Sequence, residues 1–421
     1  MRNMEQSSGA SAFIFPRRGV WEFGFLIFLI LSVALIASAC NEHPRDNSDH
    51  PRSAVNGTLW IRNQGTGSWT EEERWIASVS LTLGRIEGEG ADLFGRVWGL
   101  AVDSVGNLFV LDALAQEIRV FDRDGLHLRT FGGRGEGPGE FGYADGLRMD
   151  SEGTLWVFDP RRACLTSFRP DGTYLGSVHR PIRGSVVPWP AEFLPDGSVV
   201  DWFFSLPERN RSLPGASGSL DLYEPIRLYP GEERVDTFPG IEVRYPTVGE
   251  TRIPMAGRFA FVQSSAGPSF WSSHISEYKL VKRSLSGDTL LIVSLEGVRP
   301  SSITPTEADS LNRALNELAR LRPPGAPKPP SRRDLPRHRP VVDRLLLDDE
   351  GHLLVFPRLE GFSPGAVMDV FIEDTGEYLG RVDLPVPLAG REFPALALNR
   401  QLCFVVRGEF DVQRVVRLEL Q

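Results

Sequence analysis

The segment LAVDSVGNLFVLD, at Leu100 to Asp112, recurs as LRMDSEGTLWVFD at Leu147 to Asp159, displaced by 47 residues. The match continues downstream, where VFDRDG at Val120 to Gly125 aligns with SFRPDG at Ser167 to Gly172. Self-similarity at a period of about 40 to 50 residues is typical of stacked supersecondary units, each of which packs against its neighbours. The repeat therefore decides the architecture, and the rest of the chain can be compared with it.

The repeated unit contains four short alternating runs, which predict four β-strands. They cover Trp98 to Val102, Leu108 to Leu111, Glu117 to Phe121 and Leu126 to Phe131. Tight turns join the first pair and the last pair, because an aspartate stands three residues before a glycine in both places. The aspartate carboxylate accepts local backbone N–H groups, and the glycine adopts a positive φ. Four antiparallel strands in about 47 residues form one blade of a β-propeller.

Further copies of the unit predict a six-bladed ring. LDDEGHLLVF at Leu347 to Phe356 repeats MDSEGTLWVF at Met149 to Phe158, so this blade is well marked. Degraded copies lie at Phe193 to Tyr229 and at Arg258 to Val293. A last copy, from Ala395 to Leu420, supplies only three strands.

A strand near the N-terminus is expected to complete the last blade. Ser78 to Leu83 is a spare alternating run that belongs to no other blade. An open sheet edge leaves backbone groups unpaired and promotes aggregation, so pairing of this run with the last blade would close the ring. Thr58 to Arg62 is interpreted as a further edge strand whose position the sequence does not give.

One segment has a helical pattern. Thr304 to Glu307 is a capping box with proline at the first helical position, and leucines then recur at helical spacing up to Leu321. The predicted helix, near 304–322, belongs to an insertion at 296–340 whose second half is rich in proline and arginine.

The N-terminus has the layout of an export signal. Arg17 and Arg18 precede an apolar run from Gly24 to Ala39, and Cys40 follows directly. This pattern resembles the lipobox of bacterial lipoproteins, which implies lipidation of Cys40. A simple signal peptide or membrane anchor is the alternative, although the run is short for a span of about 20 residues. We therefore divide the chain into a signal peptide at 1–39, a flexible tether at 40–56 and a propeller at 57–421.

GRGEGPGEF at Gly133 to Phe141, with the D-x-x-G turns and IRVFD around it, resembles the NHL-like six-bladed β-propellers. It is most similar to the bacterial extracytoplasmic group of such proteins. The resemblance is specific over Arg85 to Val178 and Leu345 to Pro385, and loose across Pro188 to Ser294. Relatives with this fold include binding scaffolds, sugar-lactone hydrolases and lyases, so the resemblance implies no particular activity.

The connections of a propeller separate by face. The turns within the first and second hairpins of each blade emerge on one side, and the longer connections emerge on the other, which we call the loop face. Variable loops on a rigid scaffold are where binding residues concentrate. The candidate ligand-binding residues on this face are Arg134, Arg161, Arg162, Arg332, Arg333, Arg337, Trp98 and Tyr143. Arginine and aromatic side chains together suit carboxylate- or phosphate-bearing ligands and peptides.

The residues that could carry catalysis have structural interpretations. Aspartates beside turn glycines, such as Asp103 and Asp348, are expected to be turn residues rather than a calcium ring. Gly361 to Gly365 matches GxSxG, but Pro364 has no N–H to donate to an oxyanion, so a turn is expected. Cys164 and Cys403 fall in different blades and are expected to be buried thiols. No catalytic residue and no metal ligand is assigned.

Two functional hypotheses follow. The first is a lipid-anchored propeller on the extracytoplasmic side of a bacterial envelope, which binds a protein, peptide or glycan and is not an enzyme. The alternative is a metal-dependent hydrolase or lyase of the lactonase-like kind, for which Ca or Zn would be the cofactor. A structural lipoprotein without a specific ligand is a third, weaker possibility. The net charge of −9 argues against nucleic acid as a partner.

Overall fold

Blade 1 shows how the repeat folds. β4 (Val97–Val102), β5 (Leu108–Asp112), β6 (Glu117–Phe121) and β7 (His127–Gly132) pair in chain order, each antiparallel to the next. The predicted turns are present, because Gly106 N–H donates to the Asp103 carbonyl at 3.0 Å and φ of the glycine is +92°. The sequence pattern therefore fixes both the strand order and the register.

The computed structural model describes residues 52–55 and 58–421, except for 182–185, 187, 206–218, 233, 249–250, 275–276, 324 and 326–327. The predicted signal peptide, the predicted lipidation site Cys40 and most of the predicted tether lie outside the described residues. Within the described part of the chain, no helix is both long and apolar enough to cross a membrane.

Five further sheets repeat the pattern of blade 1. Blades 2 and 3 consist of β8 (Gly146–Met149), β9 (Leu155–Asp159), β10 (Cys164–Phe168), β11 (Tyr174–His179), β12 (Glu192–Phe193), β13 (Val199–Ser205), β14 (Ser219–Leu228) and β15 (Val235–Thr237). Blades 4 and 5 consist of β19 (Ala260–Gln263), β20 (Ser269–Ser273), β21 (Lys279–Ser284), β22 (Thr289–Leu295), β23 (Val342–Leu347), β24 (His352–Pro357), β25 (Val367–Ile372) and β26 (Tyr378–Asp383). Blade 6 consists of β27 (Ala395–Leu398), β28 (Gln401–Arg407), β29 (Gln413–Leu420) and β3 (Ala77–Leu83).

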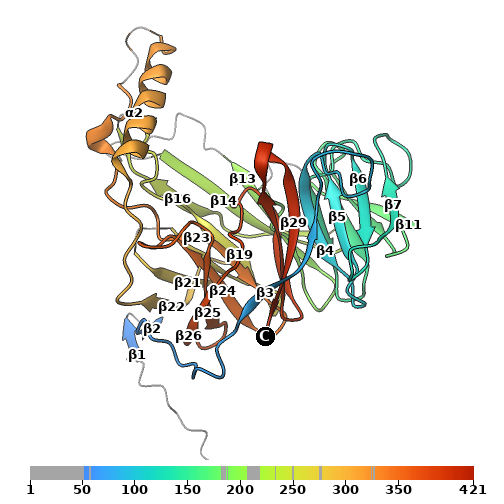
Figure 1. Ribbon diagram of the computed structural model, residues 1–421, viewed down its shortest axis with the longest axis horizontal. Helices are drawn as coiled ribbons and strands as arrows, with labels where there is room; N and C mark the ends of the chain where they lie inside the picture. The colour runs from blue at the N-terminus through green and yellow to red at the C-terminus, as the bar shows by residue number, and fades with distance from the viewer. Residues whose placement is uncertain are drawn as a thin grey trace, which may run out of the picture. The chain divides into compact units, whose positions relative to one another are not determined.

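The predicted closure of the ring is confirmed. β3 pairs antiparallel with β29, from Val415 opposite Leu83 to Leu420 opposite Ala77. Figure 1 shows the blue β3 alongside the red β29, close to the C-terminus. The last blade thus receives its fourth strand from the N-terminal side, as a closed sheet requires.

The residues before β3 form a strap along the outer edges of two other blades. β1 (Arg52–Val55) pairs with β2 (Thr58–Asn63), and β2 runs parallel to β22 of blade 4. Ser68 and Trp69 N–H groups then donate to carbonyls of β26 in blade 5, at 3.1 and 2.9 Å. Gly67 has φ +71°, and a Cβ there would lie 2.4 Å from the Leu379 carbonyl oxygen, so only glycine fits this approach. The predicted edge strand exists as β2, and it is part of a longer strap that runs along blades 4 and 5 before β3.

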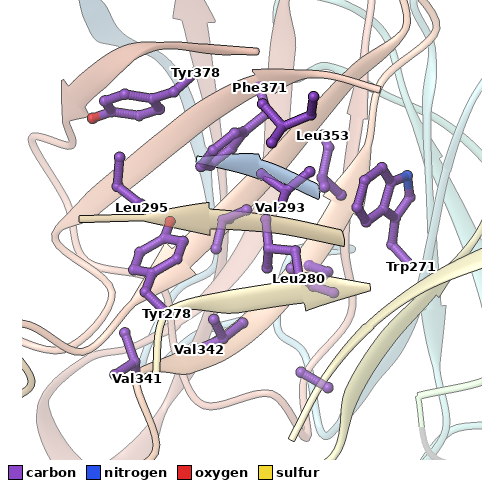
Figure 2. Close-up of a cluster of buried hydrophobic side chains, with 14 of the residues drawn as sticks. Trp271, Tyr278, Leu280, Val293, Leu295, Val341, Val342, Leu353, Phe371 and Tyr378 are labelled. Atoms are coloured by element: carbon purple, nitrogen blue, oxygen red, sulfur yellow. The ribbon is translucent and has the colours of Figure 1, made fainter. Parts of the chain in front are cut away.

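The hydrophobic core lies between the blades. Six clusters of buried side chains can be defined in the described residues, and each draws on two consecutive blades. Figure 2 shows the cluster between blades 4 and 5, where Trp271 and Leu280 face Leu353 and Phe371. The cluster between blades 6 and 1 contains Cys403 with Leu100, so the ring is sealed by packing as well as by pairing. Burial of each large apolar side chain contributes about 1.5 to 3 kcal/mol.

Blade 3 departs from the repeat. Its third strand β14 is ten residues long and pairs with two strands, β15 at one end and β16 (Ile241–Tyr245) at the other. A small hairpin, β17 (Thr247–Val248) and β18 (Thr251–Arg252), follows. β16 and this hairpin were not predicted, because neither Gly240 nor Gly249 follows an aspartate by three residues as turn glycines in other blades do.

The predicted helix is confirmed as α2 (Pro305–Arg320). The side chain of Thr304 accepts the Glu307 N–H, and the Glu307 carboxylate accepts the Thr304 N–H, which completes the capping box. A short 3₁₀ turn, η1 (Arg332–Asp334), follows in the proline-rich segment. Leu315 is buried, whereas Leu318 and Leu321 are exposed, so only part of the apolar stripe of the helix is covered.

Candidate functional site

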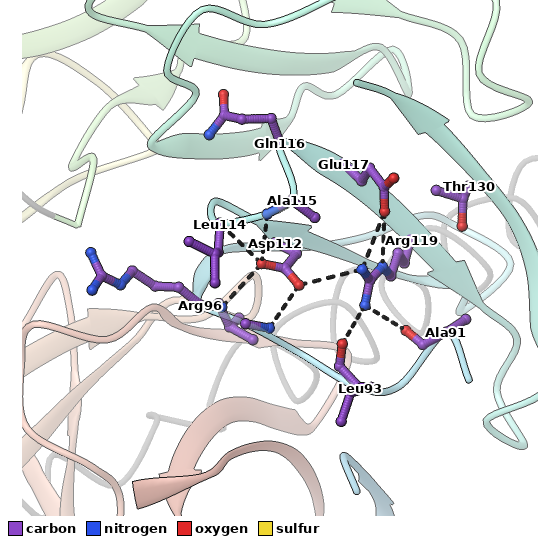
Figure 3. Close-up of polar contacts among 12 residues, drawn as sticks. Ala91, Leu93, Arg96, Asp112, Leu114, Ala115, Gln116, Glu117, Arg119 and Thr130 are labelled. Carbon is purple, nitrogen blue, oxygen red and sulfur yellow. Dashed lines mark hydrogen bonds and ion pairs between the residues drawn. The ribbon is translucent and has the colours of Figure 1, made fainter. Parts of the chain in front are cut away.

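Two buried aspartates organise the loop face at blades 1 and 2. Asp112 ends β5 and accepts the backbone N–H groups of Gly95 and Arg96 from one loop and of Leu114 and Ala115 from another, at 2.8 to 3.3 Å (Figure 3). Asp159, 47 residues later, ends β9 and accepts four N–H groups in the same way. The last residue of the repeated motif is therefore a carboxylate that holds two connections together.

An arginine fixes the glycine-rich loop of each of these blades. Arg119 donates to the carbonyls of Ala91 and Leu93, at 3.2 and 2.6 Å. Arg162 donates to the carbonyls of Gly137 and Glu140, at 3.4 and 2.6 Å. Within 133–141, Phe141 N–H also donates to the Gly133 carbonyl at 2.8 Å, so this loop closes on itself. The glycines of 133–141 thus belong to a folded turn, and Arg162 is committed largely to holding it.

The turn aspartates lie on the opposite face and behave as the sequence predicts. Asp103 Oδ1 accepts the N–H groups of Val105 and Asn107, and Asp150 and Asp348 make the same pair of contacts in their own turns. The GxSxG segment is also a turn, with Ala366 N–H donating to the Ser363 carbonyl at 3.1 Å. Cys164 and Cys403 are buried and unbridged, as expected. Among the described residues, no group of three or more His, Cys, Asp or Glu side chains could hold a metal ion.

Innermost strands β4, β8 and β23 present an equivalent position to the loop face. Trp98 and Asp343 are each the extra residue of a β-bulge, at the start of β4 and β23. Asp145 occupies the same place before β8, displaced by 47 residues from Trp98 and by 198 from Asp343. Bulges redirect side chains and are frequent beside functional sites. One repeat position thus carries an aromatic ring in blade 1 and carboxylates in blades 2 and 5.

Asp145 belongs to a buried charged cluster between blades 2 and 3. Arg180 is fully buried and donates from Nε to Asp201 Oδ2 at 2.5 Å, while its guanidinium lies over the rings of Phe158 and Phe203. Asp145 Oδ1 is buried and has no hydrogen-bond partner among the described residues. Burial, helped by the charges of Asp159 and Asp201 and opposed by that of Arg180, raises the pKa of Asp145 to about 7. No pattern in the sequence indicates this cluster.

Replacement of Asp145 by asparagine should remove a pH dependence of stability. Because the pKa of Asp145 is about 7 in the folded protein and 3.8 ordinarily, folded protein retains a proton that the unfolded chain releases. The wild-type free energy of unfolding should therefore fall as pH rises from about 4 to about 7. We expect Asp145→Asn to stabilise the protein by about 2 to 4 kcal/mol at pH 8 and hardly at all at pH 4.

Urea unfolding of both proteins at the two pH values measures this difference. Burial also raises the pKa of Glu192 to about 7, but Glu192 is present in both proteins and its effect cancels in the comparison. Equal shifts at pH 4 and pH 8 would contradict the assignment to Asp145.

The candidate binding residues of blades 1 and 2 lie together. The rings of Trp98 and Tyr143 meet edge to face at 5.5 Å, and the guanidinium of Arg96 lies 5.1 Å from the centre of the Trp98 ring. Arg134 and Arg161 are exposed, and the Arg134 guanidinium donates to the Leu114 carbonyl at 3.5 Å. Arg96 was missed in the sequence analysis, although its place next to Trp98 could have indicated it.

The candidate residues of the insertion form a second group. Arg332 Nη1 lies 2.5 Å from Asp309 Oδ1 of α2, so this arginine stabilises the insertion. Arg333 and Arg337 are exposed, and no side-chain ion pair joins either of them to another described residue. The ion pairs of Arg332 and of Arg339, which pairs with Glu307, lie within the insertion, and Arg339 also donates to the Met255 sulfur at 3.6 Å.

Apolar side chains are also exposed on the loop face. Leu114, Phe362 and Phe410 stand in the second-to-third-strand connections of blades 1, 5 and 6, and Phe410 is 87% exposed. Phe410 and Asp411 both have positive φ, which strains a residue with a side chain. The loop face thus combines exposed rings with arginines that have no acidic partner among the described residues, a composition enriched in protein interfaces.

Comparison with known proteins agrees with the fold. A family model described as 6-bladed beta-propeller (DUF5128) matches residues 93–188, which is less than half of the chain. A search of curated proteins found no match. A solved structure from Bacteroides vulgatus, a member of the DUF4221 family, is 13% identical with a TM-score of 0.50, and the alignment covers 83% of this chain and 98% of that one.

Two further solved structures are similar at lower scores. A protein from Bacteroides fragilis, described as exported, is 13% identical with a TM-score of 0.45 over 86% of this chain and 99% of that one. A gluconolactonase from Xanthomonas campestris is 13% identical with a TM-score of 0.39 over 77% and 86%. At these identities the likeness concerns the fold alone, and the chemistry has to be argued from the residues.

Proposed function

We propose that this chain is an exported propeller, anchored in a bacterial envelope, whose loop face binds an acidic protein, peptide or glycan. The observation that carries the proposal is the set of exposed arginines on that face without acidic partners among the described residues. Leu114, Tyr143 and Phe410 are exposed on the same face. Arginine can donate to a carboxylate through two N–H groups at once, and the apolar side chains would add contact area.

The anchoring part of the proposal is supported by the sequence alone. The basic residues Arg17 and Arg18, the apolar run and Cys40 follow the order of a lipoprotein signal. A diacylglyceryl group on Cys40, found by mass spectrometry of the mature N-terminal peptide, would support the anchor. An uncleaved or unmodified N-terminus would contradict it.

Charge reversal on the loop face should weaken ligand binding. We expect Arg333→Glu/Arg337→Glu to raise the Kd for an oligoglutamate peptide or a uronate oligosaccharide about tenfold or more at low salt, since both changes replace attraction by repulsion. Fluorescence anisotropy with labelled probes measures the effect.

The matched control is Arg123→Glu/Arg169→Glu, which reverses two exposed arginines in turns on the opposite face. Its net charge equals that of the test variant, so equal losses in both variants would show a non-specific charge effect and refute a loop-face site. No measurable binding of either probe by the wild-type protein would count against acidic ligands altogether.

The metal-dependent alternative has less support. The described residues contain no group of three or more His, Cys, Asp or Glu side chains that could hold Ca or Zn. Metal analysis of the purified full-length protein tests this alternative directly.

A further inference from the structure

Four arginines gather on the loop face where blades 4, 5 and 6 meet. Arg258 precedes β19, and Arg391 precedes β27. Arg344 lies in β23, and Arg358 directly follows β24. Arg258, Arg344 and Arg391 thus lie at or just before the first residues of β19, β23 and β27. These are the innermost strands of three consecutive blades, so the three arginines lie on the same side of the ring.

Their acidic partners are too few. The bulge residue Asp343 accepts hydrogen bonds from both Arg258 and Arg358 through the same oxygen, with the Arg358 contact at 3.1 Å. Glu392 is exposed, and its ion-pair contact within the described residues is Arg407 at 3.9 Å. The four guanidinium groups therefore have two carboxylates near them, Asp343 and Glu392, and Glu392 also contacts Arg407.

The cluster is held in place by backbone contacts. Arg344 donates from Nη2 to the carbonyls of Gly390 and Phe393, both at 2.8 Å, and this fixes the loop that carries Arg391. Arg391 in turn donates from Nη1 to the Phe259 carbonyl at 2.7 Å, next to Arg258. The guanidinium groups are thus positioned before any ligand arrives, which lowers the entropy cost of binding.

Most donors of the cluster are unused. Each guanidinium carries five N–H donors. Within the described part of the chain, Arg258, Arg358 and Arg391 each make side-chain contacts through a single nitrogen. Nε of Arg358 is buried and has no hydrogen-bond partner there. A buried donor without a partner is costly, so a ligand that accepts from it would be bound favourably.

The positive charges of the cluster repel one another. Burial, together with the neighbouring arginines and against the opposing effect of Asp343, lowers the pKa of Arg258 to about 10. Burial also lowers the pKa of Arg344 to about 10. A bound anion would offset the mutual repulsion of the guanidinium groups.

We propose that Arg258, Arg358 and Arg391 form a binding site for an oxyanion, namely the carboxylate, phosphate or sulfate group of a ligand. Arg344 is a positioning residue, because it holds the loop of Arg391. Guanidinium groups match the planar oxygen pairs of such anions, which ammonium groups do not. This site is separate from the exposed arginines of the proposed function, and its test does not involve them.

Isothermal titration of the full chain with sulfate, phosphate and glucuronate, at constant ionic strength, tests the site. We expect saturable binding of at least one anion with about one site per chain. Arg391→Gln should weaken that binding at least tenfold; because Arg391 is exposed, this variant should fold. Asp343→Asn should tighten binding several-fold, because it removes the carboxylate that competes for two guanidinium groups. The three anions distinguish a carboxylate ligand from a phosphate or sulfate ligand.

Arg320→Gln is the matched control, since Arg320 is an exposed arginine of α2 whose ion pair, among the described residues, is with Glu317 on its own helix. Its anion affinity should equal that of the wild type. No saturable binding of any of the three anions, or equal affinity in wild type and Arg391→Gln, would overturn the proposal. Weaker binding in Asp343→Asn would also overturn it, because a merely structural cluster would be disturbed by loss of its carboxylate.

Discussion

Replacement of Asp159 by alanine is expected to lower the free energy of unfolding by about 3 to 5 kcal/mol. The Asp159 carboxylate is buried and accepts the N–H groups of Gly142 and Tyr143 from the loop between blades 1 and 2. It also accepts those of Arg161 and Arg162 in its own blade. Without it, four backbone donors lose a charged acceptor in a place that water reaches poorly.

The matched control for this experiment is Asp171→Ala. Asp171 is also an aspartate of blade 2, but it lies in an exposed turn and accepts the Thr173 N–H at 2.8 Å. Its loss should cost about 1 kcal/mol or less. Urea unfolding followed by tryptophan fluorescence measures both variants, and similar losses in the two would show that Asp159 does not anchor the loop face.

Arg180→Met should be as damaging as Asp159→Ala, with a loss of about 3 to 5 kcal/mol. The side chain of Arg180 is fully buried, and its removal leaves Asp201 and Asp145 without a compensating positive charge. The double variant Arg180→Met/Asp201→Asn should be more stable than the single variant, because most of the cost comes from the carboxylate left unpaired.

A second ion pair of blade 3 provides the comparison. Arg227 and Asp196 also form a salt bridge, but the Asp196 side chain is more than half exposed. Arg227→Met should therefore cost about 1 kcal/mol or less. If Arg180→Met/Asp201→Asn were less stable than Arg180→Met, the loss of stability in the single variant would not come from the unpaired carboxylate of Asp201.

The strand ladder and the helix could be predicted because their signals are local. The Asp-to-Gly turns place both ends of a hairpin within about ten residues, and the capping box of α2 lies within Thr304 to Glu307. The closing strand was predictable too, because the last blade lacked one strand and the run at Ser78 to Leu83 belonged to no other blade.

The charged clusters could not be predicted, because their members meet only through the ring. Arg180 and Asp201 lie 21 residues apart with no periodic pattern between them. Arg258 and Asp343, which pair directly, are separated by 85 residues and belong to blades 4 and 5. The strap shows the same limit, since the N–H of Trp69 pairs with a carbonyl of β26 more than 300 positions later. Only an alignment of the repeats by 47 and 198 residues indicates that Trp98, Asp145 and Asp343 share one position.

The strap also determines how the folded body would respond to a mechanical load applied at its N-terminal side. A pull on Arg52 is carried first by β1 and β2 at blade 4, next by the contacts of Ser68 and Trp69 with blade 5, and only then by β3. Buried Asn63 reinforces the middle of this series, because it donates to the Gly376 carbonyl and accepts from Tyr378 N–H. The contacts at the outer edges of blades 4 and 5 would thus bear the tension before it reached the pairing of β3 with β29, which closes the ring.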